Sequence, residues 1–83
     1  MKNIIVLVSG GGTNLQALLD AEQAGGFPEG KITCVISSRR DAYALQRAEQ
    51  FHVKSRVIAK KDFADFSAYT DAMLIALQEE KAD

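Results

Sequence analysis

The sequence has a single cysteine and a single histidine among its 83 residues. One cysteine excludes an internal disulfide framework and is typical of a chain kept in a reducing compartment. Cys34 and His52 also lie far apart in the sequence, unlike the closely spaced ligand pairs of a zinc site. We therefore expect no metal site and a location in the cytoplasm.

Long apolar runs and an excess of one charge are absent as well. The longest unbroken apolar run, residues 4–8, has five residues, whereas a membrane span needs ~18 and a signal peptide a longer apolar core. Ten Lys and Arg against eleven Asp and Glu leave a net charge of −1. This balance provides no basic face for nucleic acid. A soluble domain that binds neither membrane nor nucleic acid is expected.

The chain alternates between strand-like and helix-like patterns. Strands are predicted at residues 4–8, 32–36 and 56–59. The first helix, with Leu15, Leu18 and Leu19 on its apolar face, should end at Gly25-Gly26. We expect Asp41 to cap the second helix. The third helix should bury an apolar stripe at helical spacing, which consists of Phe66, Tyr69, Met73 and Leu77.

The order β-α-β-α-β-α predicts an α/β fold with a parallel sheet and right-handed crossovers. Strands that step in one direction give the order 3-2-1, which is half of a doubly wound, Rossmann-like sheet. We expect residues 1–83 to form a single α/β phosphate-binding domain that is incomplete, because its apolar first strand stands at an edge. A missing carboxyl-terminal half or a homodimer partner would cover that strand. The alternative is a complete three-stranded domain.

The segment Ser9-Gly10-Gly11-Gly12-Thr13-Asn14 joins the first strand to its helix. Unpaired helical N–H groups, the positive end of the helix dipole and glycines that admit a ligand to the backbone favour an anion there. Thr13 and Asn14 add side-chain donors, and the segment has no negative charge. A phosphate monoester is the predicted ligand. The alternative is a structural turn in which Thr13 or Asn14 only caps the helix.

Other nucleotide motifs fit less well. No Gly-Lys-Ser/Thr follows the glycines, which excludes a P-loop. A dinucleotide fingerprint would have glycine or alanine at Leu15 and an acid after the second strand. Ser37-Ser38-Arg39-Arg40 follows that strand instead, and its hydroxyls and arginines could bind the extra phosphate of NADP. An NADP-binding Rossmann half-domain is therefore an alternative, and the simpler interpretation of this segment is a solvated basic loop. Lys60-Lys61 is expected to be solvated or to attract anions weakly.

The glycine segment and the residues after it, Leu15-Gln16-Ala17, resemble the amino-terminal motif of the phosphoribosylglycinamide formyltransferase family. That motif runs strand, Ser-Gly-x-Gly-Ser/Thr-Asn, then Leu-Gln-Ala and a helix. Val35-Ile36-Ser37-Ser38, followed by Asp41-Ala42-Tyr43, agrees with the family as well, as do the Lys61-Asp62-Phe63 loop and Tyr69. The resemblance covers nearly all of the chain.

The resemblance implies a transfer of a formyl group from 10-formyltetrahydrofolate to glycinamide ribonucleotide in purine biosynthesis. It implies that Gly11, Gly12, Thr13 and Asn14 bind the substrate phosphate. The family's catalytic Asn, His and Asp would lie beyond this chain, which alone would be inactive, and the folate pocket would lie mostly outside it. His52 is expected to be a surface or helix-terminal residue. The remaining alternative is a non-enzymatic anion-binding module.

One position departs from the family pattern. Many members have a basic residue near the folate where this chain has Phe66. Because Phe66 keeps helical spacing with Tyr69 and Met73, we expect it in the core and assign it no folate contact.

Overall fold

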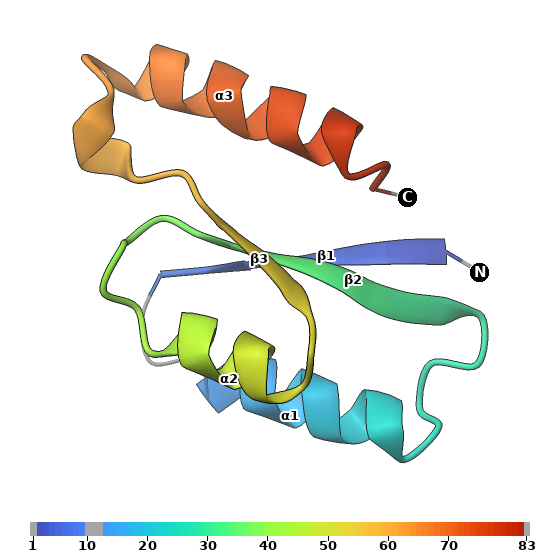
Figure 1. Cartoon of the computed structure of the whole chain (residues 1–83). Helices are drawn as coiled ribbons and strands as arrows, with labels where there is room; N and C mark the ends of the chain where they lie inside the picture. Colours follow the sequence, from blue (N-terminus) through green and yellow to red (C-terminus); the bar gives the residue numbers. More distant parts are fainter. Residues whose placement is uncertain (1, 10–12, 83) are drawn as a thin grey trace.

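The computed structural model describes residues 2–9 and 13–82. Their elements, in order, are β1 (Lys2–Val8), α1 (Thr13–Gln23), β2 (Gly30–Ser37), α2 (Ala44–Gln50), β3 (Lys54–Val57), the short 3-10 helix η1 (Lys60–Asp62) and α3 (Phe66–Glu79). The strands form one parallel sheet in the order β1-β2-β3 (Figure 1). The predicted α/β class and the 3-2-1 strand order are confirmed.

Helices cover both faces of the sheet, with α1 and α2 on one side and α3 on the other (Figure 1). The core on the first side consists of Leu15, Leu19, Ile32, Val35, Ala44 and Ala48. The predicted place of Leu18 on the apolar face of α1 is wrong, since Leu18 is 37% exposed. The core under α3 consists of Cys34, Ile36, Ile58 and Ala76. Strand β2 contributes to both cores, which makes it the centre of the molecule. Cys34 of this strand is fully buried.

Strand β2 contains a bulge at Thr33. Consecutive residues 4 and 5 of β1 pair with Ile32 and Cys34, so Thr33 is an extra residue in the ladder. The backbone N–H of Ile32 donates to the carboxylate of Glu22, which ties the end of α1 to the strand beside the bulge. The Thr33 hydroxyl is buried and has no hydrogen-bond partner among the described residues.

The three α-helices of the described chain end with a residue in the left-handed region. These residues are Gly25, His52 and Lys81, with φ of 84°, 58° and 57°. In each case the N–H of the following residue donates to the carbonyl five positions back, at 2.8, 2.9 and 3.0 Å. This pattern is the Schellman motif, which satisfies carbonyls of the last helical turn. The predicted end of α1 at Gly25-Gly26 is confirmed, and His52 is the exposed helix-terminal residue that was expected.

Two predicted boundaries are wrong. The residue before α2 is Tyr43, which caps the helix with no side-chain bond, because Asp41 pairs with Arg39 instead. Strand β3 begins at Lys54 rather than at residue 56, and its pairing with β2 starts opposite Cys34. The apolar residues Ile58 and Ala59 come after the strand, where they are buried.

The predicted core position of Phe66 is also wrong, since its side chain is 72% exposed. Phe66 is the first residue of α3, and its ring lies tilted against the outer side of Tyr69 at 6.2 Å between centroids. Phe63 takes the interior position instead, where it packs against the α3-side core and meets Tyr69 edge-on at 5.9 Å.

The two edges of the sheet differ in character. Along β3, Lys54 and Arg56 form ion pairs with Glu79 and Glu80 at the end of α3, with N–O distances of 2.7 to 3.1 Å. Along β1, the side chain of Leu7 is 54% exposed. The β3 edge is therefore attached to α3 by charge, whereas the β1 edge exposes apolar surface.

Candidate functional site

The glycine loop connects β1 to α1 at the carboxyl edge of the sheet. Of its predicted phosphate-binding residues, Gly11 and Gly12 lie outside the described residues, and Thr13 is described only as the first residue of α1. Asn14 is exposed in the first turn of that helix, which contains no acidic residue. The described part thus presents a helix amino end and an exposed amide, and the contacts of the loop itself stay a prediction.

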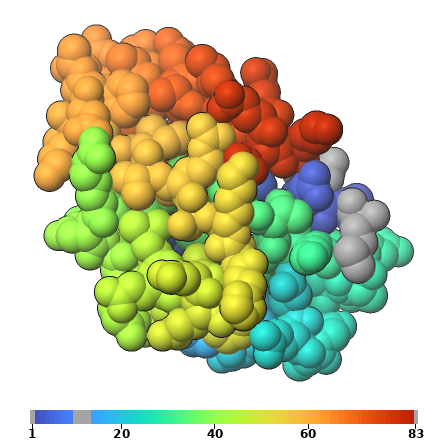
Figure 2. Space-filling view, viewed as in Figure 1, coloured from blue at the N-terminus to red at the C-terminus, as the bar shows by residue number. Residues whose placement is uncertain are grey.

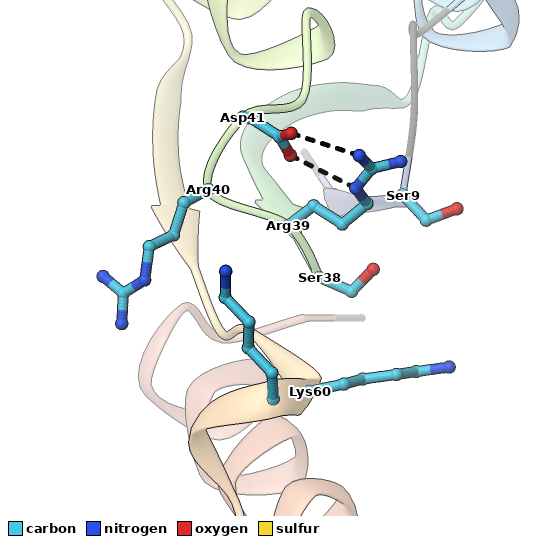
Figure 3. A pocket seen from close by; sticks show the side chains of 7 residues that line it. Ser9, Ser38, Arg39, Arg40, Asp41 and Lys60 are labelled. Carbon is cyan, nitrogen blue, oxygen red and sulfur yellow. Dashed lines mark hydrogen bonds and ion pairs between the residues drawn. The ribbon is translucent and has the colours of Figure 1, made fainter.

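A pocket of about 490 Å³ lies at the same edge of the sheet (Figure 3). Each of the three strands supplies part of its wall from the loop that follows it. The lining residues are Ser9 after β1, Ser38, Arg39, Arg40 and Asp41 after β2, and Lys60 and Lys61 after β3. Open α/β sheets bind their ligands outside the carboxyl ends of the strands, which is where this pocket lies.

Arg39 and Asp41 form a forked ion pair on the wall of the pocket (Figure 3). Arg39 donates from Nε to Oδ1 at 3.2 Å and from Nη2 to Oδ2 at 3.1 Å. These hydrogen bonds and the charge of Arg39 hold the pKa of Asp41 below its ordinary value. Asp41 is therefore ionised at neutral pH and offsets one of the pocket's cations.

Arg40 links two of the loops, because its guanidinium pairs with Asp62 of η1. Figure 2 shows the green segment around residue 40 against the yellow-orange segment around residue 60. On the η1 side, the ammonium of Lys60 lies 5.7 Å from the centre of the Tyr69 ring, within reach of a cation–π contact. Among the described residues, neither Lys60 nor Lys61 pairs with a carboxylate.

The buried Ser37 shapes the loop that follows β2. Its hydroxyl donates to the Arg39 carbonyl at 2.6 Å and accepts from the Arg39 N–H at 3.1 Å. Ser37 is fully buried, so this hydroxyl faces no ligand, and the NADP alternative loses one of its proposed donors. Ser38 remains at the pocket (Figure 3).

The pocket that the loops after β2 and β3 form together was not predicted from the sequence. The available signal was topological: Arg40 and Lys60 follow neighbouring strands of a parallel sheet, so they emerge at the same edge. His52 lies elsewhere. It connects the end of α2 to the start of β3, which places it at the amino edge of the sheet, away from the pocket.

The described residues contain neither a candidate metal site nor a helix that could span a membrane. Within residues 2–9 and 13–82, no three His, Cys, Asp or Glu side chains gather into a group that could hold a metal ion. The helices of this part of the chain are too short or too polar to cross a membrane.

Comparison with protein families gives one match over nearly the whole chain. The family model described as formyl transferase matches residues 2–83. The phosphoribosylglycinamide formyltransferase of Haemophilus influenzae is 47% identical over 73 residues, which are 88% of this chain and 34% of that protein. The protein of the same name from Saccharomyces cerevisiae is 43% identical over 74 residues, covering 77% of this chain and 35% of that protein.

Solved structures give the same match. Glycinamide ribonucleotide transformylase 1 from Symbiobacterium toebii superimposes with a TM-score of 0.92 at 40% identity, over 100% of this chain and 39% of that one. Phosphoribosylglycinamide formyltransferase from Brucella melitensis gives 0.88 at 40% identity, over 98% of this chain and 42% of that one. The chain thus spans about a third of the length of the curated relatives it matches.

Proposed function

Since this chain belongs to the formyl transferase family, we propose that it is the amino-terminal, substrate-binding part of a cytoplasmic phosphoribosylglycinamide formyltransferase. Such an enzyme transfers the formyl group of 10-formyltetrahydrofolate to the amine of glycinamide ribonucleotide. The observation that carries the proposal is the identity of 47% and 43% to two proteins of that name, from a bacterium and a yeast.

The part proposed for this chain is to hold the substrate phosphate at Gly11, Gly12, Thr13 and Asn14. Support comes from the helix that begins at Thr13, from the exposed Asn14 in its first turn and from the lack of an acid there. Helix amino ends bind phosphate because their N–H groups are unpaired and the helix dipole is positive there. Each hydrogen bond to a charged phosphate contributes about 1.5–3 kcal/mol, so a few suffice for an anchor.

Such an anchor helps the reaction although it lies away from the reacting atoms. In formyl transfer the substrate amine attacks the formyl carbon, the carbon–nitrogen bond to the folate breaks, the amine loses a proton and the folate nitrogen takes one up. Binding the remote phosphate fixes the amine against the formyl carbon, and binding energy thereby offsets part of the entropy cost of the reaction. We assign no residue of this chain to the proton transfer or to the folate, and we propose that the chain alone is inactive.

Calorimetric titration with glycinamide ribonucleotide tests the anchor. Asn14→Ala should weaken binding by roughly tenfold or more, as expected for the loss of one charge-assisted hydrogen bond. Gln23→Ala removes an exposed amide from the other end of the same helix and should leave the affinity unchanged. Equal affinity of the Asn14→Ala variant and the unchanged chain would remove Asn14 from the site.

The open β1 edge belongs to the same proposal. β1 is an outer strand whose Leu7 is 54% exposed, and α3 exposes Leu74 and Ile75. We propose that the remainder of the enzyme or a second copy of the chain covers this surface, because unpaired strand edges associate. Sedimentation of the chain tests this: self-association should be lost in Leu7→Lys. If the chain stays monomeric at high concentration, a second copy does not cover this surface, and the remainder of the enzyme is the covering part.

A further inference from the structure

We propose that the basic pocket formed by Ser9, Ser38, Arg40, Lys60 and Lys61 is a second anion site, which binds a phosphate monoester independently of the glycine loop. The inference goes beyond formyl transfer and does not depend on it. It rests on three observations: cationic side chains from two loops line one pocket, few carboxylates pair with them, and the pocket has the size and position of a ligand site.

The convergence is built by the sheet. Arg40 and Lys61 are 21 positions apart in the sequence, yet both line one pocket because their strands end side by side. The lining holds four cationic side chains against the single carboxylate of Asp41, and Asp62 outside it adds a second. The local charge is therefore positive in a chain whose net charge is −1.

The cations of the pocket are only partly neutralised. Lys60 and Lys61 have no carboxylate partner among the described residues. Arg40 pairs with Asp62 across side chains that are 63% and 39% exposed. Exposed pairs of this kind contribute little to stability. A phosphate dianion, which accepts several charge-assisted hydrogen bonds at once, can therefore displace Asp62 from Arg40 at small cost.

The size and chemistry of the pocket fit a small organic phosphate. Its volume of about 490 Å³ lies in the range of small-molecule sites. The Ser9 hydroxyl stands beside the cations as a neutral donor for phosphate or sugar oxygens (Figure 3). The Ser38 hydroxyl donates to the Val8 carbonyl at 3.5 Å and is left as an acceptor on the wall of the pocket. Asp41 does not oppose an anion with its full charge, since Arg39 holds both of its oxygens.

The described lining of the pocket shares no residue with the described part of the glycine-loop anchor. Asn14 does not belong to that lining, and Ser9 is the lining residue nearest to Asn14 in the sequence. The anchor relies on a helix amino end, whereas the pocket relies on side-chain cations from the β2 and β3 loops. Variants can therefore remove one site and leave the other intact.

The test is titration of the isotopically labelled chain with inorganic phosphate, followed by amide NMR at mildly alkaline pH and constant ionic strength. Saturable shifts are expected at Ser38, Arg40 and Lys61. Ribose 5-phosphate should produce the same shifts and ribose none, which identifies the phosphate group as the part recognised. Tighter binding of the sugar phosphate would mean that the pocket also contacts the sugar.

Arg40→Gln combined with Lys61→Gln should weaken phosphate binding at the pocket by at least about tenfold. The charge-matched control, Lys2→Gln with Lys31→Gln, removes two exposed cations at the amino edge and should leave it unchanged. Asn14→Ala should also leave the affinity of the pocket for phosphate unchanged. The result for the pocket is therefore independent of the result for the glycine-loop anchor. Equal weakening in both double variants, or phosphate-induced shifts confined to the first turn of α1, would overturn the proposal.

Discussion

Replacing His52 with glycine should stabilise the chain. His52 follows α2 with φ of 58°, in the left-handed region where the Cβ of an L-residue crowds the following carbonyl oxygen. Its side chain is exposed, and its N–H donates to the Glu49 carbonyl at 3.0 Å, a bond that glycine keeps. The substitution therefore removes a backbone cost without removing a contact of the helix end.

The size of the gain follows from two opposing effects. The left-handed conformation costs a residue with a Cβ about 1–2 kcal/mol, whereas the greater freedom of glycine in the unfolded chain offsets about 0.4–1 kcal/mol. The difference between these two ranges is about 0–1.6 kcal/mol, with a midpoint of about 0.8 kcal/mol. In a domain of this size, 1 kcal/mol changes Tm by roughly 4–8 °C, so the midpoint corresponds to a rise in Tm of about 3–6 °C.

Thermal unfolding followed by circular dichroism measures the change. His52→Ala is the matched control, because alanine removes the imidazole but keeps the Cβ, and its Tm should stay close to that of the unchanged chain. Gly25→Ala is the reverse substitution at the end of α1, where φ is 84°, and should lower Tm. A lower Tm for His52→Gly, or an equal gain for His52→Ala, would refute the reasoning.

Three further predictions concern β2 and the end of α3. Thr33→Val removes a buried hydroxyl that has no partner among the described residues. It should raise the free energy of unfolding, measured in urea, by about 1 kcal/mol, whereas Thr33→Ser keeps the hydroxyl and should not. A lower free energy of unfolding in the valine variant would contradict this. Hydrogen bonds from Lys54 and Arg56 lower the pKa of Glu80 below its ordinary value of 4.5. Ionised Glu80 therefore stabilises the fold at pH values above 4.5, and this stabilisation is lost as the pH falls through the lower pKa of the folded state. Glu80→Gln should therefore be less stable at neutral pH and lose less on acidification, and parallel curves of stability against pH would disprove it. Burial raises the pKa of the Cys34 thiol, so a thiol reagent should modify it at neutral pH at a rate that rises with urea; a rate independent of urea would show that Cys34 is accessible in the fold.

The order of the strands and the end of α1 were predictable from the sequence because they depend on handedness and on local patterns. Runs of β-branched residues marked β1 and β2, and Gly25 marked the end of α1. Strand β3 was harder to delimit, because apolar residues report burial whereas a strand is defined by its hydrogen bonds. Lys54 and Ser55 pair with β2 despite their polar side chains, and Ile58 is buried after the strand has ended.

Phe66 and Asp41 were misjudged for a related reason. Helical spacing identifies the side of α3 on which Phe66 lies, but not that Phe63 fills the interior position beside Tyr69. Asp41 has the residue type of a helix cap, but Arg39, two positions earlier, holds its carboxylate. In both cases a competing neighbour decided the outcome, and single-residue preferences do not include such competition.

The candidate site was predictable in position and only partly in composition. The carboxyl edge of a parallel sheet is fixed by topology, which places the glycine loop there without further information. The meeting of Arg40 with Asp62, and of Lys60 with Tyr69, depends on the path of two loops in space. Loop paths are set by many small contacts, such as the two hydrogen bonds of Ser37, which no sequence pattern marks.

The additional residue in β2 reverses the direction of the side chains within a single strand. Ile32 and Cys34 would point the same way in a regular strand, yet here Ile32 joins the core beneath α1 and Cys34 the core beneath α3. Deleting Thr33 would make Ile32 and Cys34 neighbours in a regular ladder, where side-chain alternation keeps them on opposite faces. Loss of this one residue should therefore be tolerated, whereas a deletion at a regular position of β2 would turn part of the strand toward the wrong helix.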